Sequence, residues 1–467
     1  MKATTRFASI WMFLAHGAIL VGCFLALSTQ LNAQCSGTQG QNGVYNPTCN
    51  GGRPGVVGSS AFIDASMFIG SASANNICAV LNWVLNPANR ILPAAGAVID
   101  ARGLNSGNTS MACTTANPSP WAGITSPPPS TILLPATGAN PIVIPSGSSG
   151  WILPNNTRLI GEGDGIPSNS LTPGTTIQAA SGFSGTMIQF GSTASTGIAV
   201  EHLTLDGKGQ AINGISNAES QANSYVDHVS LYRILGIGLS VTGTANDSGP
   251  YSNIIFDLGG VSGTSSTVCA KINGPSGTRG IHGLSCTAEN NDPPAAVLLD
   301  SSNNSIEDVR IVGFYDGIRV GANNNAQSNV LLNIIGDTNP ILGGDTPIIV
   351  VHIFNVGNTV SDLGIMGANN VGGSSSTITI QDDVTSTSLV DTSVGIYALG
   401  EAGGGGHSRF TTSPNAVHWA VGTATPTGTG CTQGSLYSCT NAFGGSASGC
   451  GSDALYVCGP SGWVGIE

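Results

Sequence analysis

The sequence is poor in charge and in aromatic residues. Of its 467 residues only 8% are charged and 6% are aromatic, whereas glycine occurs 67 times. Disordered chains usually stay soluble through charge, and this chain alternates apolar with polar residues throughout, so its composition argues against disorder. Little charge together with abundant Gly, Ser, Thr and Asn is typical of a β protein with many turns.

Lysine is the scarcest charged residue. After the first few residues only Lys208 and Lys271 occur, and 13 basic residues face 25 acidic ones, which gives a formal net charge of −12. Without a basic stripe to neutralise phosphates, the protein is not expected to bind nucleic acid. The same acidity would repel an acidic polysaccharide unless an arginine or a bound cation, such as calcium, offset it.

Long apolar runs are confined to the N-terminus. Lys2 and Arg6 introduce a largely apolar run over 7–27, and Leu-Asn-Ala at 31–33 offers a cleavage point. This order predicts a secretory signal peptide over 1–33. The alternatives are an uncleaved membrane anchor and lipidation at Cys23, although the apolar run continues past Cys23. No later stretch reaches the roughly 20 apolar residues that span a membrane, so we expect a protein that is secreted or held at the cell surface.

Ten cysteines remain after residue 33, and an even number in an exported chain predicts disulfides. The last four are separated by 7, 10 and 7 residues, which is not the close spacing of common zinc sites, so disulfides are favoured over metal binding there. The connectivity is not fixed by the sequence. The cysteines fall into local groups, namely Cys35 with Cys49, Cys78 with Cys113, Cys269 with Cys286, and Cys431, Cys439, Cys450 and Cys458.

A strand-like pattern recurs along the chain at intervals of 21 to 33 residues. The segments are EHLTL (201–205), DHVSL (227–231), SNIIF (252–256), HGLSC (282–286), EDVRI (307–311), SNVLL (328–332) and SDLGI (361–365). The third and fifth positions are apolar in each and are expected to point inward, namely Leu203 and Leu205, Val229 and Leu231, Ile254 and Phe256, Leu284 and Cys286, Val309 and Ile311, Val330 and Leu332, and Leu363 and Ile365. Such a period predicts a coil whose turns bury their faces only against neighbouring turns.

Each turn is expected to carry a second strand, about ten residues after the first. These strands are predicted over Ala211–Ile215, Ile237–Val241, Ala296–Leu299 and Gly317–Val320. Asparagines at 303–304 and 323–325 suit tight left-handed corners, where their side chains can hydrogen-bond from turn to turn. Helical repeats are excluded by the period-two alternation; a β-propeller or a β-sandwich is the remaining alternative.

The early part of the chain resembles the pectate-lyase superfamily. The resemblance rests on FIDASMF (62–68), the helix-like ANNICAVLNWVLNPA (74–88), GAVIDARGL (96–104), and the stretch from 132 to 165 that ends in LIGEGDG. It implies an all-β fold, a right-handed parallel β-helix whose open end is capped by a small helix. It is weakly specific for function, because the superfamily contains lyases, hydrolases, tailspikes and non-catalytic surface proteins.

These observations divide the chain into a signal peptide (1–33), a disulfide-linked segment (34–59), the β-helix (60–400) and a cysteine-rich β module (401–467). Residues 105–131 form an inserted loop tied back by Cys113. In the last module GSLYSC (434–439) and ALYVC (454–458) are predicted strands. Trp419 and Trp463 are candidate sugar-stacking residues there, although an aromatic residue in so small a module is more often part of the core.

Chemistry is expected on the outer face of the coil. If the apolar pairs point inward, the residues before, between and after them point outward. Neighbouring turns lie about 4.8 Å apart, so the side chains of His202 and His228 are expected nearly to touch. A parallel column is formed by Asp206, Tyr232 and Asp257, and Arg310 lies further along the same face.

Two reactions on a polysaccharide are compatible with this face. Elimination from a uronate needs a base, for which His228, Tyr232 or Arg233 are candidates, and a neutraliser of the carboxylate, either Arg310 or a cation held by Asp206 and Asp257. Hydrolysis needs two carboxyl groups about 5 to 9.5 Å apart, which Asp206 and Asp257 satisfy. His202 is a candidate for substrate binding.

Outward positions of a solenoid are polar by default, so the same cluster also arises without any activity. V-D-H at 226–228 matches only part of the W-I-D-H of calcium-dependent pectate lyases, and the N-T-D and R-I-K of polygalacturonases are absent. A non-catalytic surface or adhesion protein that binds glycans, and a tailspike-like homotrimer, are therefore alternatives to a lyase or hydrolase.

Overall fold

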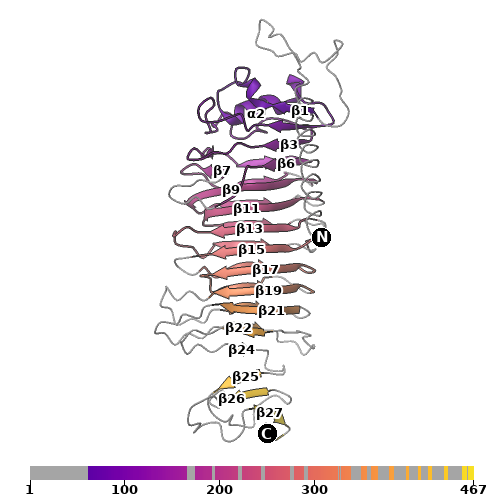
Figure 1. The fold of residues 1–467 in the computed structure, drawn as a ribbon, viewed down its shortest axis with the longest axis vertical. Coiled ribbons are helices and arrows are strands. Elements are labelled where there is room, and N and C mark those ends of the chain that lie inside the picture. The colour runs from indigo at the N-terminus through magenta and orange to yellow at the C-terminus, as the bar shows by residue number, and fades with distance from the viewer. Residues whose placement is uncertain are drawn as a thin grey trace, which may run out of the picture. The chain divides into compact units, whose positions relative to one another are not determined.

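A computed structural model describes residues 61–165, most of 174–366, and the separate segments 378–382, 396–398, 409–411, 419–422, 436–439, 455–459 and 461–466. The described strands stack in chain order as a right-handed parallel β-helix (Figure 1), which confirms the predicted fold. The signal peptide and the segment 34–59, with Cys35 and Cys49, lie outside the described residues. So do Cys431, Cys450 and the side chain of Cys439.

The coil begins with the predicted cap. Strand β1 (Ala61–Asp64) leads through η1 (Ala65–Phe68) to helix α2 (Ile77–Leu85), η2 (Pro87–Asn89) and β2 (Ala97–Asp100). The side chain of Asn76 accepts a hydrogen bond from the Ala79 amide at 2.9 Å and so starts the helix. Seven of the nine residues of α2 are buried, because the helix lies over the apolar end of the coil.

The first sheet of the coil runs from β1 and β2 through β3 (Ser130–Leu133), β6 (Thr157–Ile160), β9 (Ala199–Gln210), β11 (Tyr225–Ile234), β13 (Tyr251–Asp257), β15 (Ile281–Thr287), β17 (Ser305–Val312), β19 (Val330–Asp337) and β21 (Thr359–Met366) to β23 (Ile396–Ala398). Strands β4 (Ile142–Ile144) and β7 (Thr175–Ala179) join it beside β9. Every described pairing within this sheet is parallel, as a coil requires.

The second sheet consists of β5 (Trp151–Leu153), β8 (Thr186–Phe190), β10 (Asn213–Asn217), β12 (Ile237–Val241), β14 (Val268–Ile272), β16 (Ala295–Leu299), β18 (Asp316–Val320), β20 (Ile349–Ile353), β22 (Ile378–Asp382) and β24 (Arg409–Thr411). The four predicted second strands correspond to β10, β12, β16 and β18, and β10 is shifted by two residues. Because β24 still pairs in parallel with β22, this sheet extends past residue 400.

The first sheet folds around a corner. Strand β6 pairs with the first part of β9, where Leu159 lies beside Val200, whereas β7 pairs with the second part, where Ile177 lies beside Leu205. From β9 onward, one long strand therefore runs across two faces of the coil. The second sheet supplies the third face.

The inward register agrees with the prediction for five of the seven turns in full, since the ten side chains from Leu203 to Ile311 are at most 3% exposed. The sixth turn was predicted wrongly. Val309 pairs with Ile334 and Ile311 with Gly336, and Val330 is 43% exposed. The apolar run VLLNII carries no period-two alternation, so its register is not readable from the sequence. In the seventh turn Leu363 pairs with Ile334, in the predicted register.

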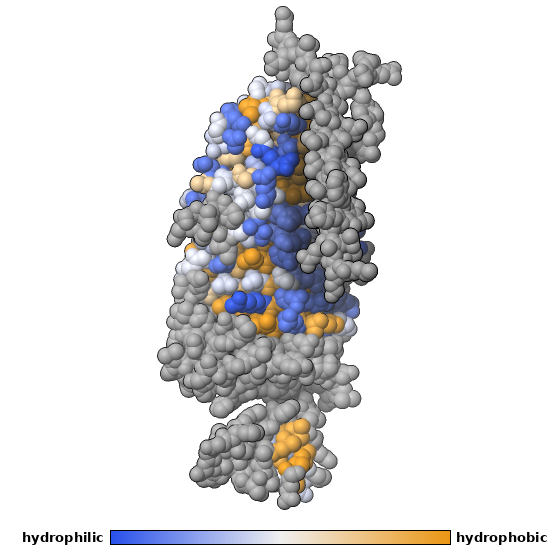
Figure 2. Space-filling view, viewed as in Figure 1, coloured by the Kyte–Doolittle hydropathy of each residue, from blue (hydrophilic) through white to orange (hydrophobic). Residues whose placement is uncertain are grey.

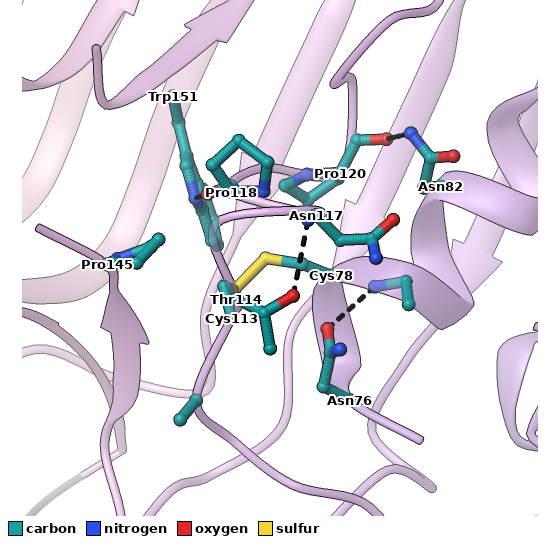
Figure 3. The surroundings of a disulfide bond; sticks show 12 residues. Asn76, Cys78, Asn82, Cys113, Thr114, Asn117, Pro118, Pro120, Pro145 and Trp151 are labelled. Atoms are coloured by element: carbon teal, nitrogen blue, oxygen red, sulfur yellow. Dashed lines mark hydrogen bonds between the residues drawn. A yellow bond between two sulfur atoms is a disulfide. The ribbon is translucent and has the colours of Figure 1, made fainter. Parts of the chain in front are cut away.

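Two of the expected disulfides are present. Cys269 of β14 and Cys286 of β15 are both fully buried and join two faces across the interior of the coil. Cys78 of α2 and Cys113 hold the loop after β2 against the helix (Figure 3). Trp151 adds to this attachment by donating from Nε1 to the Pro118 carbonyl at 3.1 Å. Cys458 is also disulfide-bonded. Disulfides are typical of proteins from oxidising compartments.

An asparagine corner stacks from turn to turn, as predicted. Asn304 accepts from the Thr278 amide at 2.8 Å and donates from Nδ2 to Asn329 Oδ1 at 2.9 Å, and Asn329 donates to the Ser301 carbonyl at 3.0 Å. Asn304 and Asn329 are at most 2% exposed, so their amides satisfy backbone groups that the coil buries. Asn323 instead contacts Asp300.

A separate mixed sheet lies near the C-terminus, formed by β25 (Trp419–Gly422), β26 (Leu436–Cys439), β27 (Leu455–Gly459) and β28 (Gly462–Ile466). Strands β26 and β27 fall on the two segments predicted as strands, and they pair antiparallel. Within the part of the chain that the structure describes, no helix has both the length and the apolar content to cross a membrane.

Candidate functional site

The bend in the first sheet places one residue of each long strand at a corner. These residues have a positive φ, namely His202 at 52°, His228 at 50°, Asn253 at 54°, Gly283 at 69°, Asp308 at 56° and Asn333 at 53°. All are residue types that tolerate the left-handed region. Because the turns are stacked in register, the corners form a column, and Asn333 Nδ2 donates to Asp308 Oδ1 at 2.6 Å along it.

The two histidines come together in this column as predicted. The rings of His202 and His228 are stacked, with centroids 4.9 Å apart and planes inclined by 27°. His228 Nδ1 lies 2.9 Å from Asp227 Oδ2, and the His228 side chain is 46% exposed. The cluster therefore presents two imidazoles and a carboxylate at the surface.

Asp227 is held by the next turn. Ser252 Oγ donates to Asp227 Oδ1 at 2.6 Å, and Asn253 Nδ2 donates to the same oxygen at 2.9 Å. Burial raises the pKa of Asp227, but the hydrogen bonds from Ser252, Asn253 and the imidazole outweigh it and hold the pKa below its ordinary value. Asp227 is thus an ionised carboxylate fixed against His228.

An open hollow adjoins the histidine pair. It encloses about 530 Å³ and is lined by His202, Arg102 and Glu162 together with apolar side chains that include Leu133 and Ile160. Arg102 donates from Nε and Nη2 to the two oxygens of Asp100, at 2.8 and 2.9 Å. The hydrogen bond from Arg102 lowers the pKa of Asp100. Glu162 accepts from the Ala136 amide at 3.0 Å.

The positions between the inward pairs are less exposed than the sequence predicts. Thr204 and Ser230 point outward, but both are fully buried. The loop after β6 covers them, because Gly165 exchanges hydrogen bonds with Thr204 Oγ1 at 2.8 and 3.1 Å and Ser230 Oγ donates to Asp164 at 3.4 Å. The positions between the inward pairs are therefore covered on these two turns, whereas the corner residues His202 and His228 remain partly exposed.

The predicted column of Asp206, Tyr232 and Asp257 is present in register. The Asp206 side chain is only 2% exposed and is bound by Arg233, whose Nη2 lies 2.5 Å from Oδ2. Gln178 Nε2 donates to the same oxygen at 2.7 Å. These contacts are those of a structural ion pair, and we assign catalysis to neither Asp206 nor Arg233.

The other predicted residues of the column face outward. The Arg233 guanidinium lies 4.8 Å from the centre of the Tyr232 ring, and Asp257 Oδ1 accepts from the Gly259 amide at 2.6 Å. Arg310 is exposed on β17, three turns from His228, which corresponds to about 14 Å of stacked strands. Arg310 is therefore too distant to act on the same sugar unit as His228.

Of the two tryptophans predicted to stack on sugars, the structure describes the side chain of Trp463. Trp463 packs against Tyr456, which is 6% exposed, and its ring lies 5.7 Å from that of Tyr437. This is the core position that was the alternative to sugar stacking. Trp419 begins β25, and its side chain lies outside the described residues.

Two features of the site were not predicted from the sequence. One is Asp227, and the other is a set of hydrogen bonds among Arg158, Glu201 and Tyr225 that holds β9 just before His202. Arg158 forks onto Glu201 at 2.8 to 3.1 Å, and the Tyr225 hydroxyl donates to Glu201 Oε1 at 2.8 Å. The V-D-H motif at 226–228 contained the signal for Asp227. Nothing in the sequence marks Arg158, because it comes from a turn 43 residues earlier.

The described strands form three parallel faces, bent at a left-handed corner and capped by a helix. The chain has the pectate-lyase-like β-helix fold. No protein-family model matches the sequence, and no curated protein matches it either.

Among solved structures, this chain is similar to a tailspike protein of Escherichia coli bacteriophage HK620 in complex with a hexasaccharide, at 16% identity and a TM-score of 0.40 over 54% of this chain and 47% of the tailspike. A mannuronan C-5 epimerase A-module of Azotobacter vinelandii matches at 14% identity and a TM-score of 0.22, covering 58% and 91%. A DFA-IIIase of Arthrobacter chlorophenolicus matches at 13% and 0.31, covering 73% and 99%. The chain spans about half the length of the tailspike structures it matches. At these scores the likenesses carry no argument about function, which rests on the site.

Proposed function

We propose that this exported β-helix binds a polysaccharide across the His202–His228 corner and the adjoining hollow, and acts on it with His228 as the base. The observation that carries the proposal is the contact between Asp227 Oδ2 and His228 Nδ1 at 2.9 Å, at the edge of a hollow lined by His202. A proton on Nδ1 donated to the carboxylate fixes the orientation of the imidazole and leaves the lone pair of Nε2 for a substrate proton.

The surroundings suit a glycan. The hollow combines apolar side chains, such as Leu133 and Ile160, with the charged Arg102 and Glu162, which matches the mixture of apolar ring faces and hydroxyl groups on a sugar. Polar residues gather in a stripe along the stacked strands in Figure 2. The corner column adds donors and acceptors at the regular spacing of the turns, about 4.8 Å.

Elimination fits the site better than hydrolysis. Hydrolysis requires two available carboxyl groups, and Asp206, one of the predicted pair, is buried against Arg233. In the elimination, Nε2 of His228 takes the C5 proton of a uronate, the electron pair forms the C4–C5 double bond, and the C4–O bond breaks to release an alkoxide that is protonated to an alcohol. Arg102 in the hollow follows β2, four turns before His228, so it would contact a neighbouring sugar unit of the bound chain and not the unit that reacts.

The test is turnover on a panel of neutral and acidic polysaccharides, followed by the absorbance of unsaturated ends and by the appearance of reducing ends. His228→Asn removes the base but keeps a residue type that Asn253 and Asn333 place at the same corner. His282→Ala, a histidine of β15 outside the cluster, is the matched control.

Unsaturated products that vanish in His228→Asn and persist in His282→Ala would support the proposal. Equal turnover by His228→Asn would refute His228 as the base. Glycan binding without turnover on any substrate would leave a non-catalytic surface role or a tailspike-like role, and a trimer in solution would favour the latter.

A further inference from the structure

The His202–Asp227–His228 cluster has the makeup of a metal site. Each residue offers one ligand atom, and these atoms all lie within 4.8 Å of one another. Two imidazole nitrogens and one carboxylate oxygen are ligands that borderline divalent ions such as Zn²⁺ favour, whereas Ca²⁺ prefers oxygen ligands alone. The composition of the cluster therefore selects a transition-metal ion over the calcium ion considered from the sequence.

The distances suit a common ion. Ligands of one ion at metal distances of about 2.05 Å are separated by roughly 2.9 Å in octahedral and 3.3 Å in tetrahedral geometry. His228 Nδ1 and Asp227 Oδ2 already lie 2.9 Å apart, so an ion replaces the proton that they share. The His202 imidazole is partly exposed and has to approach by at most about 1.5 Å for tetrahedral or about 1.9 Å for octahedral geometry, since the ligand atoms lie within 4.8 Å of one another.

The scaffold presets this arrangement. His202 and His228 occupy the same left-handed corner in consecutive turns, with φ of 52° and 50°, so the strand spacing fixes the distance between them. Ser252 and Asn253 both donate to Oδ1 of Asp227, which turns Oδ2 toward the imidazoles. Such supporting hydrogen bonds are typical of ligated carboxylates. The net charge of −12 also attracts cations to the protein.

From this geometry we infer that His202, Asp227 and His228 bind one divalent transition-metal ion, with an open coordination position toward the hollow. The inference does not rest on the proposed function, because ion binding is measured directly. It does have a consequence for that function: an ion on Nδ1 displaces the proton that His228 shares with Asp227, so saturating Zn²⁺ changes turnover if His228 is the base.

The experiment is a calorimetric titration of untagged, chelator-treated protein with Zn²⁺ at neutral pH. The expected result is a site of about 1:1 stoichiometry that releases protons on binding. His202→Asn, His228→Asn and Asp227→Asn should each weaken Zn²⁺ binding by more than about 100-fold, and Ser252→Ala by roughly 10-fold, since it removes only a supporting hydrogen bond. His282→Ala should bind as the wild type does.

Asparagine replacements keep a residue that suits the corner, and an unchanged circular dichroism spectrum and melting temperature would show that each variant is folded. The visible absorption of bound Co²⁺ provides a second readout, which should disappear in the same three variants. Absence of a 1:1 site in the wild type, or Zn²⁺ binding of wild-type strength in folded His202→Asn and His228→Asn, would overturn the inference. Zn²⁺ binding without polysaccharide turnover would support the metal site and count against the base, whereas turnover without Zn²⁺ binding would do the reverse.

Discussion

Tyr251 provides a quantitative test of the core. It begins β13 at an inward position, and its side chain is fully buried in the coil, where Asn217 Nδ2 donates to its hydroxyl. Burial raises the pKa of Tyr251 to about 12, although hydrogen bonds with Ser248 and Asn217 act in the opposite direction. The phenol therefore stays neutral in the folded protein at a pH where it ionises in the unfolded chain.

The sign and size of the effect follow from linkage. Because the folded pKa is above the unfolded value of 10.0, the contribution of Tyr251 to stability is fully present below pH 10 and is lost as the pH rises toward 12. The difference between the two pKa values corresponds to about 3 kcal/mol in total, of which roughly half is lost by pH 11.

The perturbation is Tyr251→Phe, measured by urea unfolding at pH 8, 9, 10 and 11. At pH 8 the variant should be less stable than the wild type by about 1 to 3 kcal/mol, because Asn217 loses its partner in the core. Between pH 8 and pH 11 this difference should shrink by between about 1 and 2 kcal/mol, since only the wild type has a buried phenol to ionise. Phe314→Leu, which alters an equally buried ring without a hydroxyl, should cost the same at every pH. A difference between wild type and Tyr251→Phe that stays constant up to pH 11 would refute the burial of the hydroxyl.

Three further predictions concern stability, each measured as the free energy of unfolding in urea. Replacing both Cys269 and Cys286 by alanine opens a 17-residue loop and should cost about 3 kcal/mol; a loss below 1 kcal/mol would show that the bridge does not restrain the coil. Arg233→Met should cost about 3 to 5 kcal/mol, because it leaves the Asp206 carboxylate, which is 2% exposed, without its cation. Asp206→Asn should cost less, because the arginine that it leaves unpaired is partly exposed. The reverse order of the two costs would contradict the buried ion pair. Gly313→Ala should prevent folding, because its Cβ would lie 1.6 Å from a backbone oxygen of the neighbouring turn at a φ of 75°; a soluble variant with wild-type unfolding would contradict that packing.

Much of the candidate site could be expected from the sequence, but its internal geometry could not. The stacking of His202 on His228 follows from the repeat of the strand pattern, and the structure confirms it. The corner itself was not predicted, because a single left-handed residue inside a strand leaves the alternation of its neighbours intact. Asp227 was overlooked for the same reason: its side chain becomes a partner of His228 only when the chain bends between them.

The burial of outward-facing residues by segments distant in the sequence was not predicted either. Thr204 was assigned correctly to the outer side of its strand, yet the loop after β6 buries it through Gly165. The sequence predicted Asp206 as an available carboxylate, but in the structure Arg233 and Gln178 bind both of its oxygens and bury it. Both outcomes depend on contacts between side chains of separate turns, and no local sequence pattern indicates such long-range contacts.

The sequence alone indicated that the chain coils, because period-two alternation and apolar pairs at intervals of roughly one turn are local properties that favour stacked parallel strands. It also determined which residue types are available at the surface, including the scarcity of lysine and the paired histidines. The tertiary structure decided which of these residues meet, since contacts between turns depend on where each strand bends and on which loop lies over it. The cluster at His228 differs from an ordinary polar column because a carboxylate is fixed beside two stacked imidazoles, next to a hollow. This arrangement exists only because the left-handed corners of neighbouring turns lie in register.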